Sequence, residues 1–74
     1  MKPPVLKPRE VEKILTRHGF LLDQQRGSHR DYWQELTQRT VVVPFHTRTV
    51  PLGTLRSIIK QSGLDVKDFA KKRN

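Results

Sequence analysis

Apolar residues near the start of the chain recur with the period of an α-helix. Positions spaced i, i+3, i+4 and i+7 form one apolar stripe, made of Val11, Ile14, Leu15 and His18. Pro8 suits the first helical turn because its φ is preset and it has no N–H to leave unpaired. The pattern predicts a helix over about 8–18, preceded by a flexible N-terminal arm over 1–6 that contains two adjacent prolines.

The middle of the chain changes to the alternating pattern of β-strands. FLLDQQR, at 20–26, alternates apolar and polar positions as a half-buried strand does. Gly27-Ser28 is typical of a two-residue hairpin turn with glycine first, so HRDYWQ, at 29–34, is expected to return as a second strand. A looser turn, ELTQ, leads to RTVVVPF at 39–45, a β-branched run that predicts a third strand.

The helical period returns in PLGTLRSIIKQSG, residues 51–63, which ends on Gly63, a typical C-terminal stop. Its apolar stripe comprises Leu52, Leu55, Ile58 and Ile59. A short extra helix is expected to begin at Asp65, and residues 71–74 form a basic tail. Because each stripe needs a surface to bury, the helices are expected to cover one face of a three-stranded antiparallel sheet. The predicted fold class is therefore α+β, in a single domain over 7–70.

The two-residue turn decides which hairpin residues share a face. Paired residues of antiparallel strands point to the same side. A turn at this position gives the pairs Arg26–His29, Gln24–Asp31 and Leu22–Trp33. His29 is then expected beside Arg26 at an accessible hairpin tip, whereas Arg30 and Tyr32 face the other way. A register slip of one residue would exchange these two sets, and His29 stays near the tip in either register.

Composition narrows the class of partner. The 74 residues fit one domain, and 15 basic against 7 acidic residues give a net charge of +8, spread along the chain. Such a charge favours nucleic acid, an anionic membrane surface or an acidic protein as partner. The absence of cysteine excludes disulfides and thiolate metal sites. No apolar run approaches the ~20 residues of a membrane span, and the N-terminus has no apolar signal region, so we expect a soluble cytoplasmic protein.

The stretch RGSHRDYW, at 26–33, places a titratable imidazole at the tip of this basic hairpin. Catalysis, phosphate binding and no function at all remain open for His29, and a surface histidine without function is the commonest case. RNA cleavage without a metal needs such a group, because the 2′-hydroxyl must lose a proton and the departing 5′-oxygen must gain one. Arg26 and Arg30 would hold the phosphate, and Gly27 would let the RNA backbone come close.

The remaining histidines are weaker candidates. His18 lies on the apolar stripe of the first helix, which favours a packed side chain. His46 follows the third strand, where a structural loop role is favoured over assistance at the site. The second proton-transfer group that RNA cleavage needs stays open between water, His46 and a residue that the sequence does not identify. The histidines lack metal-ligand spacing, and no glycine loop suited to phosphates is present, so we expect neither metal nor cofactor. Tyr32 and Trp33 favour packing over base stacking.

Four pieces of the sequence, in this order, resemble one known family. They are GF at 19–20, RGSH at 26–29, VPFH at 43–46 and GTLRSIIKQSGL at 53–64. The set is similar to the HicA toxins of bacterial toxin–antitoxin systems, and the likeness runs from about Glu10 to Leu64. The chain departs from the common pattern in three places. Lys7-Pro8 stands where many members have a serine cap, Asp23 stands where an apolar residue is usual, and the stretch at 31–33 is not the commonest version.

The resemblance carries expectations for fold, activity and partner. It implies a fold like that of the double-stranded RNA-binding domain, in the order α-β-β-β-α, and a metal-independent endoribonuclease that cleaves messenger RNA. It also implies that His29 is the active residue, that Gly27 and Ser28 complete its motif, and that a HicB antitoxin binds over the histidine. Two alternatives remain open from the residues themselves: a non-catalytic RNA-binding module, and a domain that binds an acidic protein.

Overall fold

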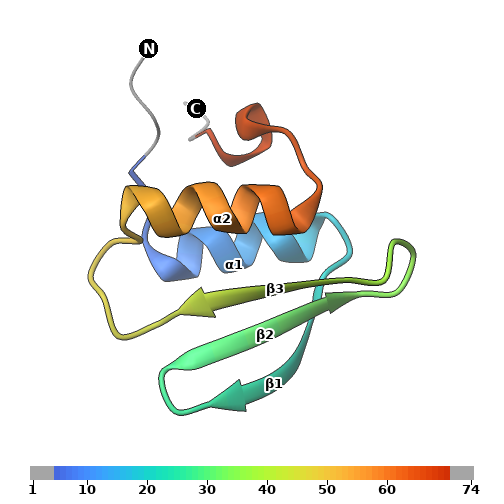
Figure 1. Cartoon of the computed structure of the whole chain (residues 1–74), viewed down its shortest axis with the longest axis horizontal. Coiled ribbons are helices and arrows are strands. Elements are labelled where there is room, and N and C mark those ends of the chain that lie inside the picture. The colour runs from blue at the N-terminus through green and yellow to red at the C-terminus, as the bar shows by residue number, and fades with distance from the viewer. Residues whose placement is uncertain (1–4, 71–74) are drawn as a thin grey trace.

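A computed structural model describes residues 5–70 of the chain (Figure 1). Its elements are α1 (Pro8–Arg17), β1 (Leu21–Arg26), β2 (His29–Gln34), β3 (Arg39–Pro44), α2 (Leu52–Ser62) and the short 3-10 helix η1 (Val66–Phe69). Every element predicted from the sequence is present in the predicted order. Residues 1–4 of the expected arm and the expected basic tail at 71–74 lie outside the described residues.

The sheet is antiparallel with the strand order β1-β2-β3. Strands β2 and β3 pair without interruption, from His29 opposite Pro44 to Gln34 opposite Arg39. A short turn over 35–38 joins these two strands and sets their register, since it brings the end of β2 directly opposite the start of β3.

The pairing of β1 with β2 agrees with prediction only near the turn. The predicted pairs Arg26–His29 and Gln24–Asp31 are confirmed. The predicted pair Leu22–Trp33 is wrong, because the register shifts between Leu22 and Gln24 and places Leu22 opposite Tyr32 and Leu21 opposite Trp33. Asp23 is the extra residue of this β-bulge, which exchanges the faces of the residues before it.

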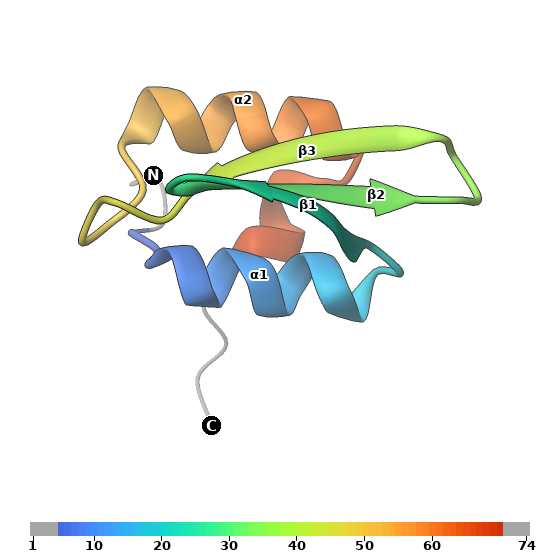
Figure 2. The ribbon, with the colours of Figure 1, turned by 90° about the horizontal axis from the view of Figure 1, so that it is seen from below.

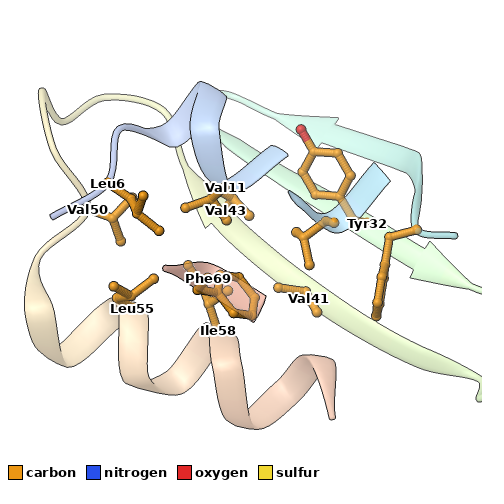
Figure 3. Packing of buried hydrophobic residues seen from close by; sticks show 11 residues of the cluster. Leu6, Val11, Tyr32, Val41, Val43, Val50, Leu55, Ile58 and Phe69 are labelled. Carbon is orange, nitrogen blue, oxygen red and sulfur yellow. The ribbon is translucent and has the colours of Figure 1, made fainter. Parts of the chain in front are cut away.

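Both helices pack on one face of the sheet, as expected. Tyr32, Val41 and Val43 point to this face, and Figure 3 shows them in the apolar core. The core comprises Leu6, Val11, Leu15, Phe20, Tyr32, Val41, Val43, Val50, Leu55, Ile58 and Phe69. We call this side of the sheet the inner face. The outer face carries the other residues of each strand, including His29, Asp31 and Val42.

Leu6 belongs to the packed domain although the sequence places it in the expected arm. Its side chain is 1% exposed, and Figure 3 shows it beside Val50. The Leu6 carbonyl also accepts a hydrogen bond of 2.8 Å from the Val50 N–H. These contacts anchor the loop between β3 and α2 because Val50 lies near the end of that loop.

Candidate active site

The β1–β2 turn has the conformation that a glycine-first hairpin requires. Gly27 has a φ of 59°, in the left-handed region, and Ser28 has no positive φ. The Ser28 carbonyl accepts a hydrogen bond of 2.6 Å from the N–H of Phe45, just after β3. The turn is therefore tied to the segment that leads into the β3–α2 loop. In Figures 1 and 2 this turn and this loop lie at the same end of the sheet.

His29 is exposed at the first position of β2 and lies opposite Arg26, as the sequence predicts. The Arg26 side chain is 64% exposed, and its Nη2 donates to Oδ2 of Asp31 over 2.8 Å. Asp31 is itself buried on the outer face, with 7% of its surface exposed. The carboxylate thus holds the Arg26 guanidinium on the face of the sheet that also carries His29, while most of the Arg26 side chain stays open to solvent.

His46 stands against His29, which the sequence does not predict. The centroids of the two rings are 5.5 Å apart and the rings are tilted by 55°. Nδ1 of His46 lies 3.3 Å from the Ser28 hydroxyl, within hydrogen-bonding distance. An open cavity of about 230 Å³ adjoins the pair and is lined by His29, Val42, Pro44, His46, Thr47, Pro51 and Thr54.

Arg30 is not brought to the side of His29. It points to the inner face, where its Nη1 donates to Oε2 of Glu12 over 3.0 Å and its guanidinium lies 4.1 Å from the centroid of the Phe45 ring. Tyr32 donates to the same Glu12 oxygen over 2.5 Å. Burial, followed by this hydrogen bond, raises the pKa of Tyr32 to about 12, so its hydroxyl stays a neutral donor. Arg30 and Tyr32 therefore join β2 to α1.

His18 is a half-buried residue at the end of α1, in agreement with the packed role expected for it. Its Nδ1 donates to the carbonyl of Ile14 over 2.9 Å, and its Nε2 lies 3.8 Å from a carboxylate oxygen of Asp68. Within residues 5–70, no group of three or more His, Cys, Asp or Glu side chains is arranged to hold a metal ion.

The pairing of β2 with β3 is the sequence signal that could have indicated where His46 lies. A short turn over 35–38 pairs Gln34 with Arg39 and, five residues further along each strand, His29 with Pro44. His46 is two residues beyond that partner, so register places it at this end of the sheet, and the course of the loop after β3 then decides that it meets His29. Local motif analysis missed it because the two histidines are 17 positions apart in the chain.

The fold and this open site define the class of protein: a small α+β domain of the double-stranded RNA-binding type, with two helices over one face of a three-stranded antiparallel sheet. A family model described as "HicA toxin of bacterial toxin-antitoxin" matches residues 8–64. The chain therefore belongs to the HicA toxin family, and that membership implies a cognate antitoxin as partner. None of the curated proteins matches the chain. No helix in the described part is long and apolar enough to cross a membrane.

Proposed function

We propose that this chain is a metal-independent endoribonuclease that cleaves messenger RNA in the cytoplasm and thereby inhibits translation and growth. His29 takes or gives the proton at the scissile phosphodiester. A HicB-type antitoxin neutralises the activity by covering this histidine. Membership of the HicA toxin family supports the toxin role, and the basic charge of +8 supports an RNA substrate.

The observation that carries the proposal is the pairing of His29 with Arg26 across an open turn. A proton-transfer group and a phosphate-binding group must lie side by side for general acid–base cleavage of RNA. Arg26 supplies the cation, and its side chain is 64% exposed despite its bond to Asp31. Both side chains are therefore within reach of one ribose-phosphate unit.

Gly27 and Ser28 complete the contact with the RNA backbone. A Cβ placed on Gly27 would meet no atom within 4 Å, so the space above the turn is open. A sugar-phosphate chain can approach the turn closely because glycine has no side chain. Arg30 takes part indirectly, since its bond to Glu12 fixes the inner side of the strand that carries His29.

The test is cleavage of a messenger RNA by purified parent protein and by His29→Ala, both in excess EDTA. The parent is expected to cleave with the chelator present. His29→Ala is expected to lose about 10²–10⁴-fold in rate and to lose toxicity, while RNA affinity and thermal stability stay close to those of the parent. His18→Gln is the matched control, because it replaces a histidine away from the site and keeps a donor for the Ile14 carbonyl.

Two results would overturn the proposal. Abolition of cleavage by EDTA with recovery in Mg²⁺ would replace the metal-free mechanism. RNA binding by the parent without any cleavage would instead assign a non-catalytic RNA-binding module.

A further inference from the structure

We infer that His46 is the second proton-transfer group of the site: it protonates the departing 5′-oxygen, and His29 takes the proton from the 2′-hydroxyl. This inference rests on the proposed nuclease function and deepens it. RNA transesterification needs both a base and an acid, and one imidazole alone supplies only one of them at a time.

The positions of the two rings fit a shared substrate. The attacking and leaving oxygens lie on opposite sides of the phosphorus, so the acid and the base must reach it from different directions. His29 comes from the start of β2, and His46 comes from the loop after β3. Their centroids are 5.5 Å apart with a tilt of 55°, and within the described residues no hydrogen bond joins the rings. Both rings border the same cavity, which can receive the substrate.

The hydrogen-bonding environments of the two rings differ, and the inferred roles follow this difference. When the His46 ring is doubly protonated, Nδ1–H can donate to the Ser28 hydroxyl, whose Oγ is 3.3 Å away, and Nε2–H is left to face the substrate. Because a hydroxyl can accept as well as donate, Ser28 can orient the protonated form that an acid requires. In the described part of the chain, the His29 ring has no hydrogen-bond partner, so its nitrogens are available to accept a proton.

The cavity itself suits a ribose-phosphate. Apart from the two imidazoles, its lining carries no titratable side chain that would compete for the transferred protons. The Thr54 hydroxyl is a donor that suits phosphate or ribose oxygens, whereas the Thr47 hydroxyl oxygen is buried. The rest of the lining is apolar, from Val42, Pro44 and Pro51.

In this reaction each of the two histidines transfers one proton. His29 removes the 2′-hydroxyl proton while the 2′-oxygen forms a bond to phosphorus. The bond from phosphorus to the 5′-oxygen breaks with its electron pair on oxygen, and His46 donates the proton that this oxygen needs. The products are a 2′,3′-cyclic phosphate and a 5′-hydroxyl, and the histidines end with their protonation states exchanged. Solvent returns both rings to their starting states.

The experiment compares two RNA oligonucleotides that differ only at the cleavage site, one with the natural 5′-oxygen and one with sulfur in its place. A thiolate leaves without protonation, so the sulfur substrate needs the base but not the acid. On natural RNA, His46→Ala is expected to lose about 10²–10⁴-fold in single-turnover rate. On the sulfur substrate, the same variant is expected to cleave within a few-fold of the parent, whereas His29→Ala stays impaired on both.

Two further variants separate chemistry from structure. His46→Asn retains a polar group toward Ser28 but cannot act as the acid, so it is expected to behave like His46→Ala. Thr49→Ala is the matched loop control, because Thr49 is exposed and does not line the cavity. Thermal melting of each variant verifies that the fold is kept.

The outcomes distinguish this inference from the function on which it rests. If the parent cleaves neither substrate, the nuclease proposal itself fails. If the parent cleaves and His29→Ala does not, then unchanged cleavage of natural RNA by His46→Ala overturns the inference alone. Equal impairment of His46→Ala on both substrates also overturns it. If His46 were the acid, the sulfur substrate would not need it, and its cleavage would be restored.

Discussion

The hydroxyl of Tyr32 and the guanidinium of Arg30 both donate to Oε2 of Glu12, at 2.5 Å and 3.0 Å. This shared acceptor joins the central strand β2 to α1 on the face opposite His29. Tyr32 is 1% exposed, so its hydroxyl depends on Glu12 for a partner that water would otherwise provide. The contact holds the strand that presents the candidate catalytic histidine.

Removing Tyr32 or Glu12 from their hydrogen bond is expected to lower the free energy of unfolding, and the loss of Glu12 should cost more. Tyr32→Phe removes the donor and keeps the ring, so it should cost about 1 kcal/mol of unfolding free energy. Glu12→Ala leaves the buried hydroxyl without its acceptor and should cost about 1–3 kcal/mol. Urea unfolding measures both. Glu35→Ala, in an exposed turn, is the control, and a Tyr32→Phe variant less stable than Glu12→Ala would contradict the expectation.

Alkaline pH is expected to weaken the fold through the same tyrosine. Burial and the bond to Glu12 raise its pKa from 10.0 to about 12. The folded state therefore holds the phenol proton more tightly than the unfolded state, and this contribution is complete below pH 10. Stability should fall as pH rises from 10 towards 12, by up to about 2–3 kcal/mol.

The chain has a single tyrosine, so ultraviolet absorbance of the phenolate reports Tyr32 alone. The midpoint in folded protein is expected near 12 and that in denaturant near 10. Urea unfolding of Tyr32→Phe over the same pH range should lack the tyrosine contribution. A folded-state midpoint equal to the denatured one would refute the expectation.

The sequence predicts the elements of this fold well because each has a local signal. Apolar stripes define the helices, Gly27-Ser28 defines the hairpin, and Gly63 ends α2 with a φ of 72°. The bulge at Asp23 was not predicted, because alternation along one strand does not reveal an unpaired residue. Asp23 was nevertheless marked as a departure from the family pattern, and the register shift occurs at this residue.

The site was predictable only in part, because some of its residues come together through the packing of segments that are distant in the chain. His29 and Arg26 belong to one hairpin, so the turn alone places them together. Arg30 follows His29 directly and must face the other side of the strand, although its positive charge suggested phosphate binding. His46 and the cavity depend on the pairing of β2 with β3 and on where the loop after β3 folds. Those are tertiary relationships that no local motif contains.

Arg26 and Arg30 are expected to respond differently to removal. Arg26→Ala should weaken RNA binding and reduce the slope of log affinity against log salt by about 0.7, the effect of one lost phosphate contact on a single strand. Arg30→Ala should leave that slope unchanged and lower the urea midpoint, because it removes the ion pair with Glu12 and leaves only Tyr32 bonded to that carboxylate. Fluorescence titration of RNA at several salt concentrations measures the slopes.

Arg9→Ala serves as control, since Arg9 is exposed on α1 and carries the same charge. A larger loss of RNA affinity for Arg30→Ala than for Arg26→Ala would move the RNA-binding surface to the inner side of β2.

Arg26→Ala should also reveal how much the stability of the fold depends on the hydrogen bond that Arg26 donates to Asp31. Oδ2 of this buried carboxylate accepts from Arg26, and Oδ1 has no partner within the described residues. Losing the guanidinium leaves a buried charge unpaired, which should cost about 1–3 kcal/mol of unfolding free energy. Asp31→Asn removes that charge, so adding it to Arg26→Ala should restore part of the loss. Urea unfolding of both single variants and the double variant gives the coupling energy, and strictly additive losses would show that Arg26 and Asp31 do not stabilise each other.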